Sequence, residues 1–258
     1  MSIKIKIISA FLCLTLLQTT GCISYPHDHD TVYQVSTIDA LLNGCYDGSI
    51  SVDVLKKHGD TGIGTFNCLD GEMLLLDRVF YKIRSDGTVV VADDSDTTPF
   101  CAITYFENKR AFELKTGTKT ADLTPALLGS PNYFYAIRIT GKFKSLKARS
   151  VPKQSKPYPP LTDVVKSQPV FSFENIEGTA VGFYSPPFVK GVNVPGFHLH
   201  FISSDRTRGG HILDFEIEKA NMQVDETHGL FMKLPDDAAF GKTDLGQDKE
   251  KDLKKVEK

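Results

Sequence analysis

The chain has 258 residues and a formal net charge of −2, with 41% hydrophobic and 24% charged residues. A chain of this size and composition can bury a substantial core, as one large domain or as two small ones. The balanced charge excludes a nucleic-acid partner, because nucleic acid attracts a clustered basic surface. The short basic run at 142–149 lacks both that wider surface and a stacking pattern.

The beginning of the chain is predicted to be an export signal. Residues 1–22 contain two lysines, then an apolar run of about a dozen residues, then the segment TTGC. This order is typical of a secretory signal peptide, and the apolar run is too short to prefer spanning a bilayer. Cys22 also resembles a lipoprotein processing site, although Thr19 stands where that motif usually has leucine. We therefore expect an exported protein, periplasmic or extracellular, with a lipid anchor at Cys22 as its one route to a membrane.

The segment 31–151 is expected to combine a few helices with a mixed sheet. VSTIDALLNG has apolar residues at helical spacing and predicts a helix that ends near Gly44. SISVDVLKKHG predicts a second short helix that ends at Gly59. Alternating apolar runs follow, divided by Asp-Gly at 70–71 and 86–87, and such pairs indicate hairpins.

A proline-rich stretch at 152–163 predicts a boundary, because proline cannot run through a central strand. A smaller β-rich part at 164–240 and a charged tail at 241–258, either a solvated helix or mobile, are expected after it. The predicted fold class is therefore α+β, with two sheet-rich halves of mixed β-sheet and a few flanking helices. The cysteines at 45, 68 and 101 lack paired short spacing, so neither a cysteine zinc site nor a disulfide framework is indicated.

Three of the seven histidines fall in GFHLHFISSDRTRGGHILDF, residues 196–215. Side chains alternate along a strand, so His198 and His200 should project to one face about 7 Å apart. If the chain then turns back, His211 lies on the neighbouring strand about 5 Å away. Three imidazoles in that arrangement could bind a metal on a β-hairpin and leave a coordination position open. Ordinary residues of a half-exposed hairpin are the alternative.

Two other functional classes stay open on these residues. An H-x-H pair followed by Asp205 resembles the first metal motif of cupins and would suggest a metal oxygenase with Asp205 as a ligand. The second cupin motif is missing, because His228 lacks its glycine and proline frame. A non-catalytic exported zinc-binding lipoprotein is suggested by PHDHD, with His27 and His29, together with Cys22.

Longer stretches carry a specific resemblance. They are YQVSTIDALLNGCYDG, HGDTGIGTFNCLDGEM, VADDSDTTPFCAITYF, YFYAIRITGKFKSLKARSVPKQ and GFYSPPFVKGVNVPGFHLHFISSDRTRGGH with the ILDFEI that follows. In sequence and in order, across nearly all of residues 33–240, they resemble the α-acetolactate decarboxylase family. The resemblance implies a two-part protein rich in mixed sheet, a zinc enzyme, and commonly a homodimer. It also implies conversion of 2-acetolactate into acetoin and carbon dioxide.

The resemblance also implies site residues. His198, His200 and His211 match the family's histidines and would bind Zn²⁺. Its catalytic residues would be Glu72 in GTFNCLDGE, Arg149 before the Val-Pro step, and Glu257 in the tail, where Glu250 competes. Thr65 and Leu69 would line the pocket. Without the resemblance, Glu72 is a solvated turn carboxylate, Arg149 belongs to an exposed strand face, and Glu257 to a disordered tail.

These groups would suit the chemistry. Loss of carbon dioxide leaves an electron pair that enters the neighbouring ketone as an enediolate, which zinc would stabilise as a Lewis acid. Arg149 would hold the substrate carboxylate. Glu72 or Glu257, protonated through burial, would then supply a proton to one face of the enediolate.

Overall fold

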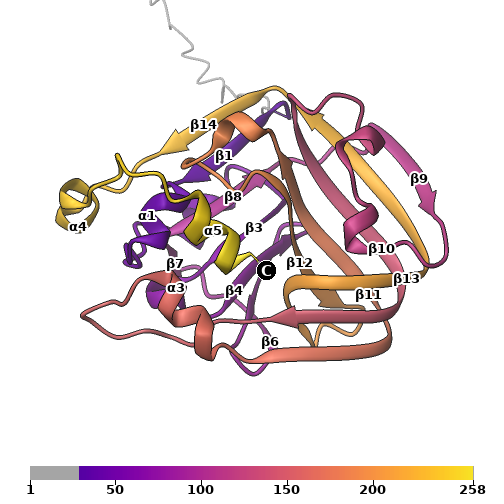
Figure 1. Ribbon diagram of the computed structural model, residues 1–258, viewed down its shortest axis with the longest axis horizontal. Helices are drawn as coiled ribbons and strands as arrows, with labels where there is room; N and C mark the ends of the chain where they lie inside the picture. The colour runs from indigo at the N-terminus through magenta and orange to yellow at the C-terminus, as the bar shows by residue number, and fades with distance from the viewer. Residues whose placement is uncertain (1–28, 258) are drawn as a thin grey trace, which may run out of the picture.

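The structure, a computed structural model, describes residues 29–257. The predicted export signal, Cys22 and His27 lie outside the described residues. Strands predominate, and the few helices are short (Figure 1). No helix within residues 29–257 is both long and apolar enough to cross a membrane. The expected class, mixed sheets with a few flanking helices, is confirmed.

The first large sheet has seven strands in the order β14-β1-β8-β3-β4-β5-β6. Its strands are β1 (Thr31–Val35), β3 (Thr61–Thr65), β4 (Glu72–Leu76), β5 (Val79–Ile83), β6 (Val89–Val91), β8 (Phe100–Thr104) and β14 (Gly229–Lys233). Strands β1 and β14 run parallel, whereas β3 and β4 are antiparallel, so the sheet is mixed. The chain therefore enters this sheet early and returns to it near its end.

The second large sheet has the order β10-β11-β12-β13-β9, and β10 also pairs with β13. Its strands are β9 (Arg110–Leu114), β10 (Phe134–Arg149), β11 (Val170–Ser185), β12 (Gly196–Ser203) and β13 (Gly209–Thr227). The pairings run from β10 through β11 and β12 to β13 and back, so these four strands close on themselves. A small third sheet joins β2 (Ile50–Ser51) to β7 (Thr97–Thr98).

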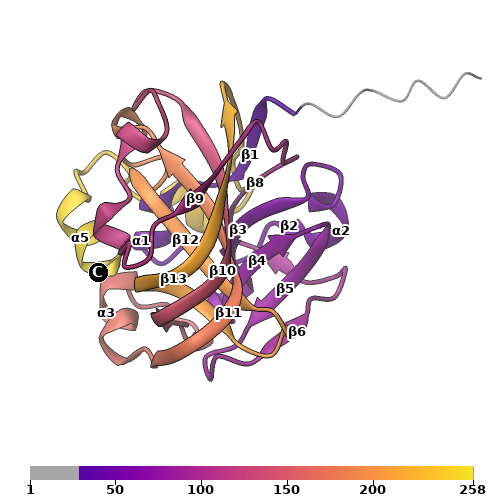
Figure 2. The same cartoon turned by 90° about the vertical axis from the view of Figure 1, so that its right-hand side faces the viewer.

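The two large sheets face each other through a shared apolar layer (Figure 2). Ile63 and Leu74 contribute to this layer from the first sheet, and Val181 and Ile202 from the second. The closed strands of the second sheet enclose a core of their own, in which Phe143, Phe201 and Phe215 pack edge to face. Burial of these apolar surfaces holds the two sheets in a fixed relative position. It therefore also fixes the positions of the polar side chains at the strand ends.

The helices are α1 (Ile38–Leu42), α2 (Val52–Leu55), α3 (Leu161–Val164), α4 (Ala238–Lys242) and α5 (Glu250–Val256). Single 3₁₀ turns cover Asn67–Leu69, Thr120–Asp122, Pro125–Leu127, Val165–Ser167 and Pro187–Val189. Both helices predicted in the N-terminal part are present, as α1 and α2. The hydroxyl of Thr37 caps α1 by accepting from the amide of Ala40.

Both predicted hairpins are present, but only one has a tight turn. Arg84 and Thr88 close the β5–β6 turn, with Gly87 at φ +78°. The β3–β4 connection is longer, because a 3₁₀ turn at Asn67–Leu69 precedes Asp70. Cys68 and Leu69 both have positive φ there. The longer connection therefore places Leu69 in the interior of the protein, where it is 1% exposed.

The proline-rich stretch 152–163 connects β10 with β11, which are neighbours in the second sheet. The division of the chain at this stretch stays a prediction. The charged tail forms α5, whose Leu253 and Val256 are buried against α1 and α3. Figure 2 shows α5 at the edge of the molecule near α1 and α3, and Figure 1 shows α4 standing apart from the sheets. The three cysteines at 45, 68 and 101 are free thiols.

Candidate metal centre and active site

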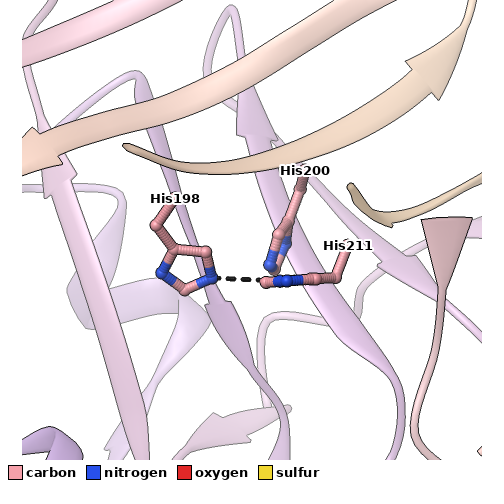
Figure 3. A group of neighbouring side chains, drawn as sticks. All are labelled: His198, His200 and His211. Carbon is pink, nitrogen blue, oxygen red and sulfur yellow. Dashed lines mark hydrogen bonds between the residues drawn. The ribbon is translucent and has the colours of Figure 1, made fainter. Parts of the chain in front are cut away.

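Three histidines meet on the β12–β13 hairpin. His198 and His200 project from β12, and His211 is the direct partner of His200 on β13 (Figure 3). One nitrogen from each ring lies within 4.8 Å of the others. The ring centroids are 4.9–5.3 Å apart, and the rings are tilted or edge-on to each other. The predicted convergence of the three imidazoles is therefore present in the fold.

The tautomer of His200 is set by the first sheet. Its Nδ1 lies 2.8 Å from the carbonyl oxygen of Met73 in β4 and donates to it. The lone pair of Nε2 therefore points toward the other two rings, and this buried atom has no hydrogen-bond partner among the described residues. A buried acceptor without a partner is costly unless it binds something. A metal ion fits this position, and the backbone carbonyl is the outer partner that a metal-binding imidazole usually has.

All three rings are held in the neutral form that binds metals. Burial, together with the charge of Arg149, lowers the pKa of His198 to about 3. Burial likewise holds the pKa values of His200 and His211 well below the ordinary value. Protons therefore compete weakly for these nitrogens near neutral pH.

Glu72 reaches the group from the start of β4. Its carboxylate oxygen lies 3.7 Å from Nε2 of His200, and the residue pairs with Thr65 across β3. Burial raises the pKa of Glu72 to about 7, against the opposing charge of Arg149 and with a contribution from Glu257. The side chain is 8% exposed, so it is no solvated turn carboxylate.

Glu257 reaches the same group of histidines from the end of α5. Its carboxylate oxygen lies 3.6 Å from Nε2 of His211. Burial raises its pKa to about 7, and Arg149 opposes the rise. Glu250, the competing residue of the tail, is half-buried and accepts a hydrogen bond from Lys190 at 2.8 Å instead. The structure therefore brings Glu257, and not Glu250, to the histidines.

Arg149 lines the same cavity as the two carboxyl groups and is 4% exposed. It ends β10, where it pairs with His211 of β13. This close approach requires a glycine, since a Cβ on Gly210 would lie 2.7 Å from the carbonyl oxygen of Arg149. The guanidinium donates to the side-chain oxygen of Gln168 and to the carbonyl of Val256, both at 2.8 Å. Arg149 is thus an interior cation and does not belong to an exposed strand face.

These groups surround one small cavity of about 40 Å³. All eight residues expected at the site line it, including Thr65 and Leu69. The hydroxyl of Thr65 donates to the carbonyl of Gly71 at 2.7 Å, which ties β3 to the turn before Glu72. Apart from these polar groups and the glycine at 64, the lining is apolar. Sequence reasoning missed the rest of this lining, which is Ile38, Leu41, Gly64, Phe100, Val151, Leu161 and Val256.

Asp205, the ligand required by the cupin-like alternative, lies elsewhere. It sits in the turn between β12 and β13, where its carboxylate accepts from the hydroxyls of Ser203 and Thr207 at 2.6 and 2.8 Å. The one group of potential metal ligands found among residues 29–257 is formed by the three histidines without it. The geometry therefore gives the cupin-like alternative no support.

The chain is similar in sequence and in fold to proteins that are already known. The sequence profile described as alpha-acetolactate decarboxylase matches residues 32–247. The chain is 52% identical to the alpha-acetolactate decarboxylase of Methanosarcina mazei, over 89% of this chain and 81% of that protein. It is 44% identical to that of Bacillus licheniformis, over 84% and 87% of the two chains. The crystal structure of alpha-acetolactate decarboxylase from Bacillus subtilis strain 168 superposes with a TM-score of 0.86 at 40% identity, covering 88% of this chain and 99% of that one.

These matches define the class of protein first: an enzyme with the mixed-sheet fold of the decarboxylase structures. The extent of the profile and the identity to several relatives then fix the family. The chain belongs to the alpha-acetolactate decarboxylase family.

Proposed function

We propose that this protein converts 2-acetolactate into acetoin and carbon dioxide, with Zn²⁺ bound by His198, His200 and His211. The observation that carries the proposal is the convergence of three neutral imidazoles on a cavity that also holds a buried arginine and two buried carboxyl groups. The names of the relatives support the substrate. Three protein ligands would leave a coordination position for substrate.

The metal would supply Lewis-acid stabilisation of the negative charge that develops on the substrate oxygens as an enediolate forms. The protein's part would be to leave the positive charge of the metal ion as large as possible. Imidazoles are neutral ligands, whereas carboxylate ligands would partly cancel the charge. The bond from Nδ1 of His200 to the carbonyl of Met73 holds one ring in the orientation that this role requires.

Arg149 would bind the carboxylate that is lost. Its Nε is buried and has no hydrogen-bond partner among the described residues, so one donor is free for an anion. As the bond to the carboxyl carbon breaks, its electron pair moves into the neighbouring ketone and carbon dioxide leaves. Arg149 would orient the breaking bond, while the apolar wall keeps water from the electron-rich intermediate.

Glu72 and Glu257 are the two candidate proton donors. Each carboxyl has a pKa of about 7 because of burial, so each holds a proton in a sizeable fraction of molecules at neutral pH. Glu72 approaches His200 from β4 of the first sheet, whereas Glu257 approaches His211 from the end of α5. Protonation from one side would give a single acetoin enantiomer.

We propose further that the protein is exported and forms a homodimer. The order of charged, apolar and small residues in 1–22 supports export, with either cleavage or acylation at Cys22. Mass spectrometry of the protein from its host separates these two forms, and light scattering measures the assembly. An intact N-terminus would contradict the proposed export. A monomeric mass would contradict the proposed homodimer.

The central test is an anaerobic assay of the purified mature chain, supplied with zinc and 2-acetolactate, together with analysis of its metal content. We expect bound zinc and acetoin formation well above the uncatalysed rate. A zinc-loaded, folded protein that forms no acetoin would instead favour the exported zinc-binding alternative. Oxygen consumption with bound iron would favour an oxygenase.

A further inference from the structure

Arg149 is a buried cation that lacks a carboxylate partner. Among residues 29–257 no Asp or Glu oxygen lies within 4.0 Å of its guanidinium nitrogens, although Glu72 and Glu257 line the same cavity. Buried charges are normally paired, because an unpaired ion in the interior is costly. The side chain is held instead by two neutral oxygens, one from Gln168 and one from the carbonyl of Val256.

Gln168 lies in the connection between β10 and β11, directly after the 3₁₀ turn Val165–Ser167. Arg149 is the last residue of β10 and pairs with Val170, the first residue of β11, so Gln168 lies just beyond the end of this pairing. Its Oε1 accepts from Nη1 of Arg149 at 2.8 Å. Gln168 is half-buried and is not part of the cavity lining. It therefore acts on the site only through the arginine.

We propose that Gln168 is a positioning residue that fixes the guanidinium of Arg149 with a neutral acceptor, so that the full positive charge stays available to the carboxylate of the substrate. Glutamate has the same length and could reach the same nitrogen, but its charge would pair with the arginine. The substrate carboxylate would then compete with the glutamate carboxylate for the guanidinium of Arg149. The inference rests on the proposed function, since it assigns Arg149 to an anionic substrate.

The test uses two substitutions of the full-length, zinc-loaded protein. Gln168→Glu keeps the shape and adds a negative charge at Arg149. Gln168→Met keeps the approximate length and removes the acceptor without adding charge. Gln223→Glu is the control, because it adds the same charge to a half-buried position at the far end of β13 from His211.

Binding is measured by calorimetry with two probes. The anionic probe is 2-hydroxy-2-methylpropanoate, which has the carboxylate and the hydroxyl but no ketone and so is not decarboxylated by this route. The neutral probe is acetoin. For Gln168→Glu we expect the Kd of the anionic probe to rise at least about tenfold, the scale of one charge-assisted hydrogen bond. The Kd of acetoin should change less than about twofold. In the control Gln223→Glu, the Kd values of both probes should also change less than about twofold.

Measurements of KM and kcat distinguish a loss of Arg149 positioning from general damage to the active site. In Gln168→Glu the KM for 2-acetolactate should rise with the Kd of the anionic probe, while kcat changes less. Gln168→Met should raise the Kd of the anionic probe severalfold, but less than Gln168→Glu does. Equal weakening of both probes in either variant, or wild-type binding in both variants, would overturn the inference. Absence of acetoin formation by the wild type would instead overturn the proposed function, because the probe measurements do not require turnover.

Discussion

Nε2 of His211 lies 3.6 Å from a carboxylate oxygen of Glu257. The contact joins the β12–β13 hairpin to the last helix of the chain. A second contact joins β10 to the same helix, because the carbonyl of Val256 accepts a hydrogen bond from Arg149. The site is thus assembled from the first sheet, the second sheet and α5, and each can be tested separately.

Replacing His200 by alanine should abolish both bound zinc and turnover, because two nitrogens cannot replace the three-nitrogen set. Metal content by mass spectrometry and the acetoin assay measure the two losses. His58→Ala is the matched control, since His58 stacks on Tyr33 with the ring centroids 3.9 Å apart and lies outside the cavity lining. Retained activity in His200→Ala would remove the metal role from this residue.

Glu72→Gln should give folded, zinc-loaded protein whose turnover is lower by at least about a hundredfold, the scale of a lost general acid. Glu257→Gln tests the other candidate donor on the same preparation. The substitution of the true donor should also disturb the enantiomeric excess of acetoin, which chiral chromatography measures. Near-normal turnover in both variants would show that neither carboxyl supplies the proton.

The buried carboxyls should make the metal-free protein less stable as the pH rises. Burial raises the pKa of Glu72 from 4.5 to about 7, so between these values the folded state binds more protons than the unfolded state. Stability therefore falls through this window, by roughly 3 kcal/mol for such a shift. Glutamine does not ionise, so Glu72→Gln should be the more stable protein at pH 8. The difference should shrink as the pH falls to about 4.5.

Urea denaturation after chelation of the metal measures this difference. Asp86→Asn is a control, because Asp86 is an exposed residue bonded to Thr88 in a surface turn. A Glu72→Gln protein that is less stable than the wild type at pH 8 would contradict the expected sign.

Leu253→Ala should detach α5 without unfolding the rest of the protein. A helix of seven residues is far below the roughly 12–15 residues that form alone in water, so its buried face must hold it. Leu253 is 6% exposed, and its truncation should remove about 2–5 kcal/mol of packing. We expect faster hydrogen exchange in 250–256, lower turnover and a nearly unchanged Tm. Lys251→Ala, on the exposed side, should behave as the wild type; a large loss of Tm in Leu253→Ala would show that α5 unfolds only with the whole protein.

The sequence predicted those parts of the fold and site that depend on local pattern. Strand alternation places His198 and His200 on one face, and the Asp-Gly pair at 86–87 marks a tight turn. The Asp-Gly pair at 70–71 did not reveal the 3₁₀ turn before it, because positive φ at Cys68 and Leu69 has no sequence signal. Such conformations are imposed by the surroundings.

The tail was the hardest part to predict. Its composition is that of a solvated segment, and only Leu253 and Val256 provide an apolar face. Whether two apolar residues find a partner depends on α1 and α3, which lie far away in sequence. The placement of Glu257 and the role of the Val256 carbonyl follow from that packing, and no spacing rule could supply them. The family resemblance pointed to a glutamate near the end of the chain and could not distinguish Glu257 from Glu250.

The unpaired charge of Arg149 also bears on how the enzyme would empty its cavity. A buried cation with no carboxylate in contact favours an anionic occupant and stabilises an uncharged one little. The proposed reaction turns a monoanion into two neutral molecules and consumes one proton. The chemical step therefore removes the charge for which the occupant was held. The donor, Glu72 or Glu257, is left as a carboxylate in the same cavity as Arg149. We therefore expect acetoin to leave readily, and the next acetolactate to bind well only after that carboxyl group has regained its proton.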